Sequence, residues 1–257
     1  MIDWEQLFLF ELIFMRMTGF VLFNPLLGRN NLSNIVKAGM ALVLAAAVFS
    51  SAEAAPPPVP TGTVELVLRL LLELGVGFVL GFVMQLCIAV VQVGGEIIDT
   101  QMGMTMAQTY DAGSQVNMTV TGSLLNILFV LNFFAENGHY TLMRVLVTSG
   151  EVLPFGTVAF GEAVASRVAE LFLACLVLAV KLALPILAAE LLGELGMGIL
   201  MKAIPQINAF VINIELKVII GLGLLFLFLT PINEFLLEVE MGMLSELGQM
   251  LRVIGGG

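Results

Sequence analysis

The chain has 257 residues, of which 59% are hydrophobic and 12% charged, and its formal net charge at pH 7 is −10. Ordinary soluble domains are about 25% charged, and disordered chains combine low hydrophobicity with high net charge, so the composition excludes both classes. The acidic balance also argues against a nucleic-acid-binding surface. We therefore expect a protein that lies in a membrane or is covered by other apolar proteins.

Roughly six long apolar segments follow one another along the chain, and none alternates apolar and polar residues as a half-buried strand does. The segments are Leu7–Leu27, Val36–Ser51, Val64–Val93, Val116–Ala135, Val164–Leu192 and Phe210–Leu237. The proline-rich stretch Ala52–Thr63 is a predicted loop, and further breaks are expected at Gly138, at residues 150–161 and at residues 193–206. The predicted fold class is all-α, with membrane-associated helical hairpins.

Charged side chains interrupt most of these segments. A spanning helix needs about 20 largely apolar residues, and only Leu74–Gly95 and Ala112–Ala135 reach that length without an acidic or basic residue. A charge at the bilayer centre costs at least about 2.5–3.5 kcal/mol. The interrupted segments favour a subunit whose helices are covered by a larger hydrophobic assembly. The alternative is a membrane protein whose charges pair within the chain or reach the membrane surface.

Small residues predict a close helix contact in the third segment. The spacing Gly77-x-x-x-Gly81 lets another backbone approach. A dinucleotide-binding loop does not fit, because Gly75-x-Gly77 is followed by Gly81 and no strand precedes it.

Residues that would carry out catalysis are missing from the sequence. No recognised catalytic, nucleotide-binding or metal-binding motif occurs, and His139 stands alone in a polar turn. Cys87 and Cys175 lie in separate apolar runs and are expected to be buried packing residues. The sequence therefore predicts a protein that is not an enzyme, with no catalytic, metal or cofactor site.

A polar stretch, residues 94–117, lies between the two uninterrupted segments. Its side chains Glu96, Asp99 and Gln101 need partners if they lie at membrane depth. Met102, Met104 and Met106 are spaced two apart, and flexible thioethers on an irregular loop can seal against surfaces that change. Composition alone leaves an ordinary connecting loop and a functional gate equally open.

A second polar cluster, residues 202–221, follows the fifth segment. Pro205 breaks a helix there, and Gln206 and Asn208 can satisfy the freed backbone groups. An interhelical turn is one interpretation. The other is that at least one of three charged residues makes a desolvated ion pair with another subunit. These three residues are Lys202, Glu215 and Lys217.

Three blocks of residues, in order over nearly the whole chain, resemble the FliR family of type III secretion export-apparatus proteins (the FliR/SctT family). The first runs from Arg16-Met-Thr-Gly19 through Asn24-Pro25-Leu-Leu-Gly28 to Lys37. The second is Gly95-Glu96-Ile-Ile-Asp99-x-Gln101-Met-Gly103-x-x-x-Ala107, and the third is Lys202-x-x-Pro205-Gln206-x-Asn208-x-Phe210 with Lys217 and Gly221.

The resemblance implies a core subunit of the flagellar export gate in the bacterial inner membrane, at the flagellar basal body. Implied partners are FliP-like and FliQ-like subunits, an FlhB-like subunit and unfolded flagellar export substrates, with no nucleic acid. Residues 1–161 would be FliP-like and residues 162–257 a FliQ-like hairpin. The implied subunit contacts involve Arg16, Glu96, Asp99, Gln101, Lys202, Gln206, Asn208, Glu215 and Lys217.

In this family the loop at residues 102–117 would project into the pore as a plug, here formed by Met102, Met104, Met106, Thr109 and Tyr110. The chain departs from the family in that loop, because family members commonly carry aromatic residues at the positions of Met106 and Thr109, and Asp-Pro in place of Asp111-Ala112. A different class remains as an alternative, namely a small secondary transporter or ion channel with buried charged residues. Such a protein should show an internal repeat with matching broken helices, and no such repeat is evident.

Overall fold

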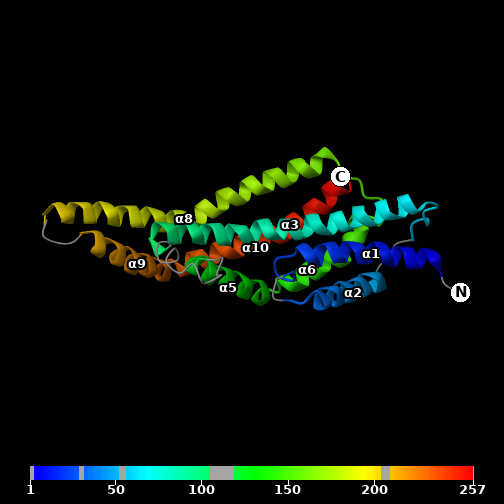
Figure 1. The fold of residues 1–257 in the computed structure, drawn as a ribbon, viewed down its shortest axis with the longest axis horizontal. Helices are drawn as coiled ribbons and strands as arrows, with labels where there is room; N and C mark the ends of the chain where they lie inside the picture. The colour runs from blue at the N-terminus through cyan, green and yellow to red at the C-terminus, as the bar shows by residue number, and fades with distance from the viewer. Residues whose placement is uncertain (1–2, 29–31, 52–55, 105–118, 204–208, 257) are drawn as a thin grey trace. The chain divides into compact units, whose positions relative to one another are not determined.

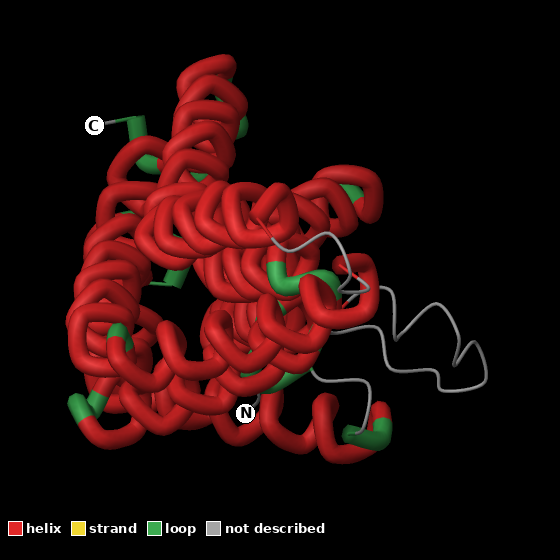
Figure 2. Tube along the Cα trace, turned by 90° about the vertical axis from the view of Figure 1, so that its left-hand side faces the viewer, coloured by secondary structure: helices red, strands yellow, loops and turns green. Residues whose placement is uncertain are grey.

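The computed structural model describes residues 3–28, 32–51, 56–104, 119–203 and 209–256. In these ranges the regular structure is entirely helical, as Figure 2 shows, which confirms the predicted all-α class. The helices are α1 (Trp4–Phe23), α2 (Asn34–Ser51), α3 (Thr63–Gln101), α5 (Val120–Ala135), α6 (Gly138–Val147), α7 (Ser149–Val152), α8 (Glu162–Ala203), α9 (Ala209–Leu227) and α10 (Leu229–Ile254) (Figure 1).

The helices form two compact units, each assembled from separate parts of the chain. Unit 1 contains residues 1–87, 136–172 and 241–257, and unit 2 contains residues 88–135 and 173–240. Both units therefore draw on residues before and after 161, the expected boundary between FliP-like and FliQ-like parts. The compact units reflect how the helices pack, whereas the expected boundary at residue 161 concerns similarity to two other protein families.

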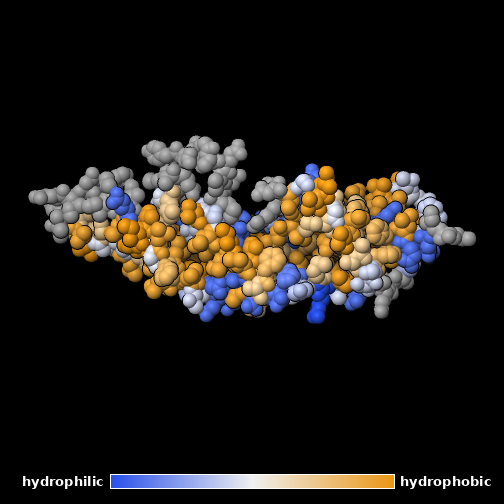
Figure 3. All heavy atoms as spheres, turned by 90° about the horizontal axis from the view of Figure 1, so that it is seen from below, coloured by the Kyte–Doolittle hydropathy of each residue, from blue (hydrophilic) through white to orange (hydrophobic). Residues whose placement is uncertain are grey.

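Four helices are long and apolar enough to cross a membrane, namely α1, α2, α3 and α8. Two further candidate spans are broken: α5 and α6 meet at a bend of 68°, and α9 and α10 at a bend of 64°. Apolar side chains cover much of the face drawn in Figure 3, as expected for surfaces in contact with lipid or with other apolar proteins.

Two helices extend further than the sequence indicates. Helix α3 continues through Gly94 and Gly95 to Gln101, and α8 continues through Gly193 to Ala203. The break expected over residues 193–206 therefore begins later than predicted, after Ala203, and the first part of the polar stretch is helical. Glycine costs a helix only about 1 kcal/mol relative to alanine, and packing offsets that cost at Gly94 and Gly95, where an added Cβ would meet other chain segments within 3 Å.

The end of the chain also differs from the expectation. The predicted last segment divides into α9 and α10, and α10 reaches Ile254 with Met250 and Leu251 buried. The helix therefore extends well beyond Leu237, where the last predicted segment ends, because an apolar stripe continues along it.

The predicted glycine contact in the third segment is confirmed within unit 1. A Cβ on Gly77 would lie 2.1 Å from the Arg16 carbonyl oxygen, and one on Gly81 would lie 2.8 Å from the Phe23 carbonyl carbon. Gly19 completes the contact from α1, since its Cβ would lie 2.3 Å from the Leu74 carbonyl oxygen. The backbones of α1 and α3 touch because glycine carries no side chain.

Candidate functional site at the ends of the α3–α5 connection

The C-terminal end of α3 and the first turn of α5 are joined by one carboxylate. Asp99 is fully buried and accepts hydrogen bonds from the backbone N–H of Thr121, at 2.9 Å, and from the Thr121 hydroxyl. Helix N-termini leave N–H groups unpaired and favour negative charge, so the carboxylate acts there as a cap from another helix. The contact fixes the two chain positions that flank residues 102–119.

A close backbone contact lies one helical turn from this cap. A Cβ on Gly95 would lie 2.4 Å from the Cα of Gly122, so any larger residue at position 95 would separate α3 from α5. The pairing of Gly95 with Gly122 explains why the motif begins with glycine. This close contact also brings Asp99 within hydrogen-bonding distance of Thr121.

A second polar group connects the end of α3 to the hairpin of α8 and α9. Lys217 on α9 forms an ion pair with Glu194 on α8, and the Gln101 amide donates to the same Glu194 oxygen at 3.5 Å. The lysine and glutamate side chains are 22% and 35% exposed, so the described chain encloses the pair only in part. Three helices thus meet at one carboxylate.

Met102 follows these polar contacts and is fully buried. Its thioether lies against Gly221 of α9, where an added Cβ would lie 2.5–2.8 Å from the Met102 Cγ, Cε and Sδ atoms. Gly221 is therefore the recess that accepts this side chain. Gly103 has a positive φ of 76°, which glycine adopts without steric cost, and it ends the regular part of α3.

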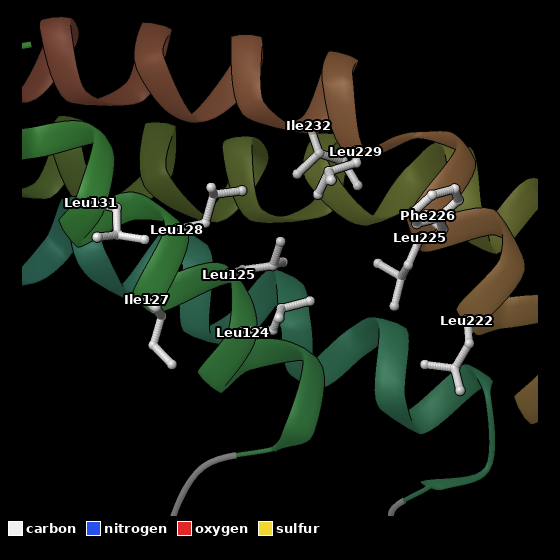
Figure 4. A pocket seen from close by; sticks show the side chains of 10 residues that line it. All are labelled: Leu124, Leu125, Ile127, Leu128, Leu131, Leu222, Leu225, Phe226, Leu229 and Ile232. Atoms are coloured by element: carbon white, nitrogen blue, oxygen red, sulfur yellow. The ribbon is translucent and has the colours of Figure 1, made fainter. Parts of the chain in front are cut away.

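An apolar pocket of about 450 Å³ lies elsewhere in unit 2, with side chains of α5 and of the α9–α10 junction pointing toward the same space (Figure 4). Beyond it, the Asn132 amide donates to the Asn233 side-chain oxygen at 2.9 Å. This hydrogen bond links α5 to α10 close to the bend between α9 and α10, where apolar contacts alone would not fix the register.

In unit 1, Arg16 forms a fully buried network. Its Nε donates to Glu73 at 2.6 Å, and its two other nitrogens donate to the Ser149 hydroxyl at 3.2 Å and to the Leu153 carbonyl at 3.1 Å. The second Glu73 oxygen accepts the Gly156 N–H at 2.8 Å. Arg16 also lies 4.2 Å from the centroid of the Phe155 ring. All charge here is satisfied inside the chain.

The remaining residues of the first motif form the turn after α1. The buried Asn24 side chain accepts the N–H groups of Leu26 and Leu27 at 2.8 and 3.1 Å. Lys37 on α2 donates to the Gly28 carbonyl at 2.9 Å. These contacts fix the backbone around Asn24, and they explain the residue types by local structure.

The other predicted site residues divide into two groups. Glu96, Lys202 and Glu215 are exposed, and Met104 is half-buried next to the end of α3. The rest lie outside the described residues: Met106, Thr109, Tyr110, Gln206 and Asn208.

Sequence reasoning missed the partners of the predicted residues. Glu73, Thr121 and Glu194 complete the three polar contacts, and each is distant in sequence from the residue it binds. The sequence did offer a signal for Glu73, because an acidic residue inside an apolar run needs a partner. It offered none for Thr121, because nothing in the sequence distinguishes this threonine from the others in apolar segments.

The fold and these contacts define the class: an α-helical membrane protein with several candidate spans, in which the buried Arg16 and Glu73 pair within the chain. Bacterial export proteins, family 1, match residues 7–241. The chain belongs to that family.

Similar proteins come from flagellar and Yop systems. The chain is 29% identical to flagellar biosynthetic protein FliR of Bacillus subtilis over 212 residues, 81% of each chain. It is 29% identical to FliR of Escherichia coli over 215 residues, 84% of this chain and 81% of that one. With Yop proteins translocation protein T of Yersinia pestis it shares 28% over 201 residues, 77% and 74% of the two chains. The chain is thus a membrane-embedded subunit of a flagellar or type III export gate, within a larger export complex.

Proposed function

We propose that the chain is a non-enzymatic core subunit of a flagellar export gate in the bacterial inner membrane, at the flagellar basal body. Its neighbours would be FliP-like and FliQ-like subunits and an FlhB-like subunit, and unfolded flagellar proteins would pass through the assembly. Residues 1–161 would occupy a FliP-like place and residues 162–257 a FliQ-like one.

Exposed charges on apolar helices carry this proposal. Glu11 on α1 and both Glu170 and Lys181 on α8 are exposed, although these helices are apolar enough to cross a membrane. A charge facing lipid near the bilayer centre costs at least about 2.5–3.5 kcal/mol. Partner subunits that supply polar groups would remove that cost, whereas a chain alone in lipid would not. Internal pairing, the alternative considered above, accounts for Arg16, for Lys217 and for Glu170, which pairs with Arg167 at 3.3 Å. For Glu11 and Lys181 the described residues show no ion pair.

The connection between α3 and α5 would serve as the pore plug. The fixed ends at Asp99, Thr121 and Gln101 support this role, because a plug must be anchored where it leaves the helices. Met104, Met106, Thr109 and Tyr110 would be the sealing side chains. Met102 would act differently, as the buried anchor next to Gly221.

Two kinds of assembly residue follow from their surroundings. Arg16, Asp99, Gln101 and Lys217 would support assembly by holding the chain in the conformation that its partners bind. The exposed residues Glu96, Lys202 and Glu215 would contact neighbouring subunits directly, together with Gln206 and Asn208.

Expression with and without partners tests the proposal. We expect the chain alone to be degraded or to aggregate, and co-expression with FliP-like and FliQ-like proteins to restore a stable complex in detergent. A matched sample co-expressed with an unrelated helical membrane protein controls for general loading of the membrane. A lone chain that purifies as one stable species, with the same lifetime in both samples, contradicts a gate subunit.

A further inference from the structure

One lysine of unit 2 faces two glutamates. Glu190 and Glu194 are four residues apart on α8 and so lie on the same face of that helix. Lys217 of α9 pairs with Glu194, and it also attracts Glu190, which Glu194 repels. The helices α8 and α9 lie beside each other (Figure 1), with the Lys217–Glu194 pair joining them.

The two glutamates differ in what satisfies them. Glu190 is 1% exposed, and among the described residues its Oε1 has no hydrogen-bond partner. A buried polar atom without a partner is costly, whereas a partly exposed ion pair such as Glu194 with Lys217 contributes little. Transfer of Lys217 to Glu190 would satisfy the buried oxygen, and Glu194 would be left at a partly exposed position.

The surface of α9 makes such a transfer a one-turn movement. Gly221 lies four residues after Lys217, so a slide of one turn, about 6 Å, places Lys217 where Gly221 now lies. The contact at this level has a glycine on one side: Gly193 of α8 faces Ile220 of α9, with 3.9 Å between an added Cβ and the Ile220 Cδ1. One-turn displacements between packed helices are an established kind of conformational switch.

The movement would also change the surroundings of Met102. That side chain fits against Gly221 with no room for a Cβ, so a lysine in the same place would expel it. We propose that α9 has a second register on α8, one helical turn from the observed one, in which Lys217 pairs with Glu190 and Met102 leaves its recess. This inference is independent of any sealing role of the α3–α5 connection.

Cysteine cross-linking distinguishes the two registers in the complex formed with co-expressed partner subunits. In a Cys87→Ala, Cys175→Ala background, Gly193→Cys with Ile220→Cys reports the observed register. Gly193→Cys with Leu216→Cys reports the second, because Leu216 lies one turn before Ile220. The second state should form a minor product, since alternative conformations are commonly populated at about 0.1–10%.

Glu194→Gln should raise the 193–216 product several-fold, and Glu190→Gln should abolish it. Glu238→Gln, at an exposed position on α10, should leave both products unchanged. A Met102→Cys variant should gain reactivity toward a thiol reagent in the Glu194→Gln protein. The proposal is overturned if the 193–216 product is absent from both the native and the Glu194→Gln proteins. It is also overturned if Glu190→Gln forms as much of the 193–216 product as the native protein does. If Glu194→Gln does not accumulate, the comparison of native protein with Glu190→Gln decides.

Discussion

Asp99 at the end of α3 caps the first turn of α5 through Thr121, so a single carboxylate holds together the two helix ends that flank residues 102–119. The contact is buried, and its strength comes from the charged acceptor, because hydrogen bonds to ionised groups are about twice as strong as neutral ones. It gives the spacing of Gly95 and Asp99 a structural cause within this chain.

Thr121→Val should lower the free energy of unfolding by about 1–3 kcal/mol, because it leaves part of a buried carboxylate without its donor. The measurement is the midpoint of thermal aggregation of the detergent-solubilised complex. Thr141→Val, at an exposed position on α6, is the matched control. Equal midpoints for both variants would show that Asp99 finds another donor.

Glu73→Ala should destabilise unit 1 by about 3–5 kcal/mol, since it leaves Arg16 buried without its counterion. The double variant Arg16→Met, Glu73→Leu should recover much of the loss, because apolar residues of similar volume often replace a buried ion pair without penalty. Glu65→Ala removes a pair with Arg69 that is partly exposed and should cost far less. The cellular level of each variant and its yield of complex measure the ranking of the three stabilities.

Gly221→Ala should destabilise unit 2 by about 1–3 kcal/mol, because its Cβ would overlap the Met102 side chain. Met102→Ala alone should cost about 2–5 kcal/mol by leaving a cavity. The double variant should be more stable than the sum of the two losses predicts, since the new methyl group enters the vacated space. Strict additivity in thermal stability would mean that the two positions do not share one recess.

Lys217→Ala should reduce complex recovery and motility more than Arg252→Ala. Lys217 forms an ion pair with Glu194, whereas Arg252 is exposed near the end of α10. Partial exposure limits the effect to about 1 kcal/mol. A double-mutant cycle with Glu194→Gln measures the coupling, and small equal effects of both substitutions would show that Lys217 is merely solvated.

Met104, Met106 and Tyr110 changed together to alanine should make the inner membrane leak ions when partner subunits are co-expressed, because side-chain volume in the α3–α5 connection would be lost. The larger deletion of residues 103–111 should give the same result. Ion permeability is measured beside complex yield. Leak with an intact complex supports the plug, and a tight membrane with an intact complex refutes it. Met102→Ala, a buried residue, should change stability without leak.

The sequence by itself determined the class and the approximate helices. Composition, apolar run length and the absence of strand periodicity are local properties, so they predicted an all-α membrane subunit, and Gly77-x-x-x-Gly81 correctly indicated a backbone contact. The order of the three motifs along the chain also indicated the family. Composition, run length and motifs can be read from the linear sequence without the fold.

Tertiary structure alone decided which residues meet. Arg16 pairs with Glu73, Asp99 with Thr121 and Lys217 with Glu194, and no pattern along the chain specifies these partners. The continuation of α3 through Gly94 and Gly95 is likewise decided by packing against Leu182 and Gly122, which outweighs the weak helix propensity of glycine. Propensity is a local energy of at most about 1 kcal/mol per residue, whereas partner choice depends on how the whole chain is folded.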